Sequence, residues 1–69
     1  MHMDDRRLAR IRSEYHEMPG LKLTVAQASR FWNLGLEESL IALEQLVEAR
    51  VLWRTRDGHY VLVTDSPAV

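Results

Sequence analysis

The sequence predicts an α+β domain in which three helices are followed by a two-stranded β-hairpin. Three observations lead to this fold class. Apolar residues recur at spacings of three and four in three successive segments, which is typical of amphipathic helices. Residues that end helices separate those segments, and Asp57-Gly58 stands between two strand-like runs near the C-terminus. A chain of 69 residues is expected to form one domain, which we place at residues 4–63, with a flexible tail at 64–69.

The first helix is expected over residues 4–18. Asp4 and Asp5 suit a helix start, because carboxylates accept hydrogen bonds from free N–H groups and favour the positive end of the helix dipole. The Pro-Gly dipeptide that follows ends the helix. One face is expected to be buried, and it carries Leu8, Ile11, Tyr15 and Met18.

The second helix has a sharp start signal. Thr24, followed three residues later by Gln27, is typical of a capping box, in which side chains and backbone N–H groups bond reciprocally. The helix is expected over residues 25–32, since Asn33 tolerates the left-handed conformation in which helices end. Its buried side is expected to carry Val25, Ala28, Phe31 and Trp32.

The third helix, expected over residues 36–50, carries more apolar residues than one core-facing stripe requires. The stripe itself is predicted to consist of Leu40, Leu43, Leu46 and Val47. Leu36 and Ile41 are additional. They either widen the core of a small protein or contact a second protein.

The last element is a hairpin with strands over residues 51–56 and 59–63. We expect a two-residue type I′ turn at Asp57-Gly58, which would place Trp53 opposite Leu62. In that register Arg54, Arg56 and His59 converge on one face. The other face carries Trp53, Thr55, Tyr60 and Leu62. Trp32 and Trp53 are interpreted as core residues, the alternative being stacking platforms for single-stranded nucleic acid.

Composition excludes several classes of function. The chain has no cysteine, so it has neither disulfides nor a thiolate metal site. His2, His16 and His59 are too scattered to predict a metal centre, and no glycine-rich phosphate loop is present. No segment is apolar enough for a signal peptide or a membrane span. We therefore expect a cytoplasmic protein that is not an enzyme and has no cofactor, metal, membrane or small-molecule ligand.

Three stretches resemble parts of the winged helix-turn-helix family. LTVAQASRFWNL at residues 23–34 is similar to the first helix and turn of a bacterial helix-turn-helix. LEQLVEARVL at 43–52 is similar to the end of a recognition helix, and WRTRDGHYV at 53–61 to a short wing. The resemblance covers residues 15–63. It implies binding to double-stranded DNA, with the third helix in the major groove and the wing on phosphates or in the minor groove.

Carried onto this sequence, the resemblance predicts a set of DNA-binding residues. Arg54, Arg56 and His59 would contact DNA from the wing, Lys22 and Arg30 would contact phosphates, and Gln45 would read bases. The third helix departs from the family pattern, because residues 36–50 contain four glutamates and one arginine. Several glutamates close to phosphates would repel DNA.

The alternative hypothesis is a winged-helix module that binds protein and not DNA. Its interface would lie on the acidic and apolar third helix, through Leu36, Glu37, Ile41 and Glu44. The partner would be a second copy of the chain or a larger protein. The formal net charge of −1 favours this alternative, since dedicated nucleic-acid binders are more often basic.

Overall fold

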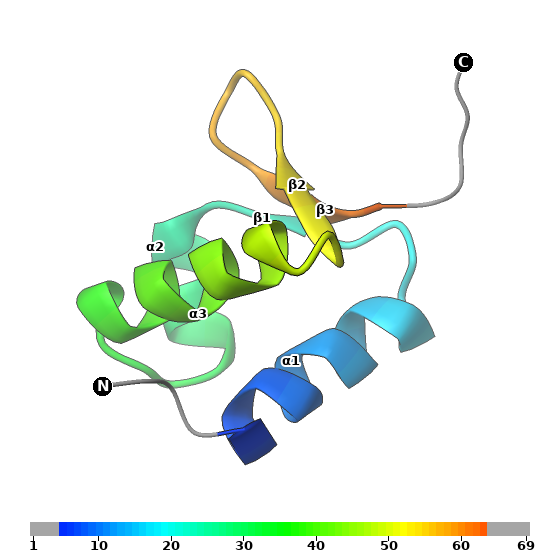
Figure 1. Ribbon diagram of the computed structural model, residues 1–69. Coiled ribbons are helices and arrows are strands. Elements are labelled where there is room, and N and C mark those ends of the chain that lie inside the picture. Colours follow the sequence, from blue (N-terminus) through cyan, green and yellow to red (C-terminus); the bar gives the residue numbers. More distant parts are fainter. Residues whose placement is uncertain (1–4, 64–69) are drawn as a thin grey trace.

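The computed structural model describes residues 5–63, which form an α+β fold of three helices and a three-stranded antiparallel sheet (Figure 1). The helices are α1 (Asp5–Glu17), α2 (Val25–Phe31) and α3 (Leu36–Glu48); the strands are β1 (Lys22–Leu23), β2 (Leu52–Arg54) and β3 (Tyr60–Leu62). The three-helix prediction is confirmed. The expected start at Asp4 and the expected tail at 64–69 lie outside the described residues.

Local capping interactions set the limits of α2 and α3. The predicted capping box is confirmed, with Gln27 N donating to Thr24 Oγ1 at 3.1 Å and Thr24 N donating to Gln27 Oε1 at 3.0 Å. After α2, Asn33 takes the left-handed conformation at φ 55°, as expected. Arg50 ends α3 in the same way at φ 66°, so the helix stops two residues before the predicted limit.

The core lies where all three helices meet the inner face of the sheet. Tyr15 and Ile11 of α1 are fully buried, and the Tyr15 hydroxyl donates to the Tyr60 carbonyl oxygen at 2.8 Å. This bond ties α1 to β3 across the core. The other buried apolar residues are Leu23, Ala28, Trp32, Ala42, Leu43, Leu46, Leu52 and Tyr60. Trp32 is therefore a core residue, as predicted.

Four residues that were expected in the core are exposed. They are Met18, Phe31, Leu40 and Trp53. On α3 the predicted Leu43 and Leu46 are buried, and the other buried positions are Ser39 and Ala42. The buried face is thus rotated relative to the predicted stripe. The distance between packed helices depends on the side chains at their contact, and small residues at 39 and 42 permit close approach of the neighbouring elements.

The sheet contains a strand that the sequence analysis missed. β1 pairs antiparallel with β3, with Lys22 opposite Val61 and Leu23 opposite Tyr60, so the strand order is β1-β3-β2. The hairpin is therefore not a free two-stranded wing over its whole length, because its root is part of this sheet. A strand of two residues is too short to show the alternation by which strands are recognised in a sequence.

The predicted hairpin register is wrong by one residue. Trp53 pairs with Val61 and Arg54 with Tyr60, where we expected Leu62 and Val61. Thr55 N donates to His59 O at 2.8 Å, leaving a three-residue loop whose last residue, Gly58, has φ 86°. A type I′ turn needs positive φ at both central residues, and only Gly58 of the two has it.

This register exchanges the two faces of β2, whereas Tyr60 and Leu62 of β3 keep the face that was expected for them. Successive side chains of a strand point to opposite faces, so a shift of one residue exchanges them. Leu52 and Tyr60 face the core and are buried, and Arg54 stands beside Tyr60 on the same face. Trp53 and Val61 are on the opposite, outer face of the sheet.

Candidate functional site

The exposed side of α3 presents a line of acidic and apolar residues. Spacings of four, three and four residues place Glu37, Ile41, Glu44 and Glu48 in one row along the helix. Leu36 and Leu40 flank the row, and Leu36 is 60% exposed and Ile41 44%. No lysine or arginine occurs within α3. We call these six residues the α3 face, and it unites all four residues of the predicted protein interface.

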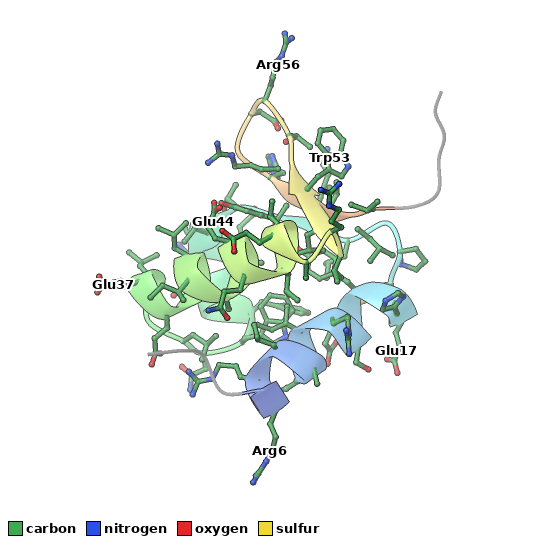
Figure 2. All side chains as sticks on the ribbon, in the orientation of Figure 1. Arg6, Glu17, Glu37, Glu44, Trp53 and Arg56 are labelled. Atoms are coloured by element: carbon green, nitrogen blue, oxygen red, sulfur yellow. The ribbon has the colours of Figure 1, made fainter. Side chains whose placement is uncertain are left out.

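Glu44 joins the α3 face to the hairpin. Its Oε2 accepts a hydrogen bond from the Tyr60 hydroxyl at 2.7 Å and lies 3.8 Å from Arg54 Nη1 (Figure 2). Burial raises the pKa of Tyr60, and the hydrogen bond and charge of Glu44 raise it further. Arg54, predicted to hold DNA, therefore stands beside a carboxylate that partly offsets its charge.

Gln45, the predicted base reader, does not belong to the α3 face. It is half-buried and lines a pocket with Leu8, Ala9 and Arg12 of α1. On the helical wheel it falls about 100° from Glu44, on the side of α3 that faces α1. The positions of α3 that point outward are therefore glutamates and aliphatic residues, which offer no donor to base edges.

The wing residues do not converge as predicted. Figure 2 shows Arg56 at the tip of the hairpin, pointing away from the body of the protein. Arg54 is on the inner face, whereas His59 pairs with Thr55 on the outer face. The expectation of one basic hairpin face is wrong, because it relied on the two-residue turn.

A small polar network holds the wing tip together. The Asp57 carboxylate accepts a hydrogen bond from the Thr55 hydroxyl, and its Oδ1 lies 3.1 Å from His59 Nδ1. These contacts, the Thr55 bond first, lower the pKa of Asp57 to about 2. The carboxylate at the tip is therefore already engaged by its own hairpin.

Lys22 and Arg30 come together, although they are eight positions apart in the sequence. Both line one surface pocket with Leu23, Gln27 and Phe31, between β1 and α2. Of the six predicted DNA-binding residues, these are the two that share a described pocket. Two cations with one amide form a surface that suits phosphate oxygens.

The outer face of the sheet is a second exposed surface, which the sequence analysis did not identify. It carries Lys22 on β1, Val61 on β3 and Trp53 on β2 in one row, followed by the Thr55–His59 pair. We call these five residues the outer sheet face. Trp53 is 52% exposed. The sequence signal was available, since Asp-Gly also suits a three-residue loop that places Trp53 outside.

Searches for metal-binding and membrane features cover the same described residues. Between residues 5 and 63, no group of three or more His, Cys, Asp or Glu side chains could hold a metal ion. No helix in that part of the chain is long and apolar enough to cross a membrane. Comparisons of the chain with protein-family models, curated proteins and solved structures found no match.

Proposed function

We propose that this protein is a winged helix-turn-helix module that binds another protein through its α3 face. The order of elements supports the family: α1, a short strand, α2, a tight turn, α3 and a hairpin. The capping box that starts α2 and the left-handed residue that ends it give the two central helices the spacing that a helix-turn-helix requires.

The single observation that carries the function is the composition of the α3 face. In a DNA-binding winged helix this surface enters the major groove, where phosphates lie on both sides. Here three glutamates occupy it, and desolvating them near phosphates is unfavourable. Exposed apolar side chains beside charged ones are instead typical of a protein interface, with an apolar centre and a polar rim.

The charge of the α3 face also bears on the choice between a second copy and a different partner. A symmetric dimer through this face would bring glutamates of two copies together, and like charges across an interface are repulsive. A partner with an apolar groove edged by lysine or arginine would complement both features of the face. We therefore infer a larger, locally basic protein as the partner.

The experiment places a photo-crosslinking amino acid at position 41, on the α3 face, and at position 26, an exposed position on α2. We expect a defined protein adduct from position 41 and none from position 26. The purified partner is then titrated with the full chain and with Ile41→Asp, which should weaken binding about tenfold or more if Ile41 is central to the interface. Equal crosslinking from both positions, or an Ile41→Asp variant that binds normally, would contradict the proposal.

A second candidate function is sequence-independent contact with duplex DNA. The observation in its favour is the shared pocket of Lys22 and Arg30, with exposed Arg56 as a further cation. Fluorescence anisotropy with a mixed-sequence duplex over a salt series tests it. Binding that weakens steeply with salt and is lost in a Lys22→Ala/Arg30→Ala variant would support it. Absence of binding at low salt would exclude it.

A further inference from the structure

The hairpin register leaves a large aromatic ring on an open surface of the sheet. Trp53 is half exposed, lies in β2 at the edge of the three-stranded sheet, and makes no ring contact with another described aromatic residue. Figure 2 shows it on the side of the hairpin opposite Glu44, and it lines a pocket with Val47 and Glu48 at the end of α3. Half of the Trp53 side chain is in solvent, so the ring is available to bind a ligand.

The charged side chains around Trp53 are mostly basic, and Glu48 at the end of α3 is the exception. Lys22 lies in the same row, two strands away, at a Cα separation of about 10 Å given strand spacings of ~4.8 Å. His59 lies on the same face, and Arg50 lines a pocket with Trp53, Val63 and Glu48. The outward positions of the three strands include no carboxylate, and Asp57 at the tip is engaged by Thr55 and His59.

We propose that the outer sheet face binds single-stranded nucleic acid, with a base stacked on Trp53 and Lys22 contacting a backbone phosphate. Every base has a π face, so stacking on one tryptophan gives affinity without sequence preference. The separation of ring and ammonium across β3 leaves room for the sugar between base and phosphate. The partly buried Val61, between them in the row, provides an apolar floor. This site shares Lys22 with the duplex contacts considered above and adjoins the α3 face at Glu48, and its distinguishing residue is Trp53.

The test uses the full chain and a fluorescein-labelled oligothymidylate of about 12 nucleotides, within the range of single-strand site sizes. An abasic oligonucleotide of the same length carries the same phosphates but no bases. We expect binding at low ionic strength that is weaker for the abasic strand, together with quenching of the exposed tryptophan by the thymidylate. Stacking on one aromatic residue corresponds to a change of roughly 5- to 150-fold in affinity.

Variants separate stacking from charge and from folding. Trp53→Leu keeps an apolar side chain without the ring. It should lower the affinity for thymidylate by roughly the same factor and leave the affinity for the abasic strand unchanged. Trp53→Phe should restore most of the affinity. Ile41→Ala, on the α3 face, is the matched control and should bind normally. Circular dichroism of each variant confirms that it is folded.

Three results would overturn the inference. One is no binding of thymidylate at low ionic strength. Another is equal affinity for the thymidylate and abasic strands, which would reduce the interaction to charge alone. The third is a Trp53→Leu variant that binds thymidylate normally but has lost self-association in sedimentation experiments, which would assign the outer sheet face to a second copy of the chain.

Discussion

The α3 face and the outer sheet face are both exposed and partly apolar, and they differ in charge. The α3 face carries three glutamates and no lysine or arginine, whereas the five residues of the outer sheet face include Lys22 and His59 and no carboxylate. In a winged helix the helix is the usual nucleic-acid surface. Here the helix is acidic, and the basic side chain Lys22 lies on the sheet. The comparison teaches that a fold presents surfaces, and the side chains on each surface decide what it binds.

The largest expected effect tests whether α3 has one structural side and one free side. Leu43 is 0% exposed and Leu40 is 41% exposed on the same helix. We expect Leu43→Ala to lower the free energy of unfolding by about 2–5 kcal/mol, because it leaves a cavity in the core. Leu40→Ala should lower the free energy of unfolding by well under half of that amount. Urea denaturation of both variants measures the difference, and similar losses would show that the α3 face is part of the core.

The sequence predicted the helices because their signals are local. Thr24 with Gln27, Asn33 and the spacing of apolar residues act within one or two turns of the chain. The hairpin register is not local, because Asp57-Gly58 suits two loop lengths. The choice depends on which residue of β2 packs into the core, and Leu52 takes that place while Trp53 is left 52% exposed. That tertiary requirement has no sequence signature.

The candidate sites divide in the same way. The α3 face was predictable, because helical spacing alone places Glu37, Ile41 and Glu44 in one row. The grouping of Arg54, Arg56 and His59 was not, since it depended on the register. Trp53 was assigned to the core from its spacing and its place at the root of the hairpin, and only the pairing with Val61 shows that it faces outward.

The second prediction concerns Gly58, the last residue of the hairpin loop that sets the pairing of β2 with β3. Gly58 has φ 86°, a conformation that costs an L-residue roughly 1–2 kcal/mol. Gly58→Ala should therefore destabilise the protein by about that amount and move the amide resonances of Trp53 and Val61 more than those of α3. Gly20→Ala is the control, because a Cβ there meets nothing within 4 Å and no positive φ is required. Equal effects of the two changes would argue against the observed loop.

The third prediction concerns the buried bond that fixes β3 against α1. Tyr15→Phe removes the hydroxyl that donates to the Tyr60 carbonyl oxygen. We expect the free energy of unfolding to fall by about 0.5–1.5 kcal/mol at neutral pH. Burial raises the pKa of Tyr15 above its ordinary value of 10.0, with a smaller contribution from Tyr60. A raised folded pKa adds stability below pH 10 that is lost as the pH rises further. The advantage of the wild type over Tyr15→Phe should therefore shrink above pH 10 in denaturation experiments, and a constant difference would contradict the buried phenol.

The smallest expected effect lies at the tip of the outer sheet face. The hydrogen bond from Thr55 is the main reason that the pKa of Asp57 is lowered to about 2. Thr55→Val should return this pKa towards 3.8, measured by NMR titration of the Asp57 carboxyl carbon. Because the folded pKa is depressed, the linked stability is present above the unfolded pKa and is lost between about pH 4 and 2. An unchanged titration midpoint in the variant would show that Thr55 does not hold the carboxylate.

We infer that α3 in this protein does not read DNA. An amide chemical-shift map of the full chain, titrated with a mixed-sequence duplex at low ionic strength, tests it most directly. We expect the amide resonances at positions 37, 41, 44 and 48 to keep their chemical shifts, with any changes confined to Lys22, Arg30 and the hairpin. Shifts that are largest along that row of α3 would contradict the claim and make α3 a recognition helix despite its glutamates.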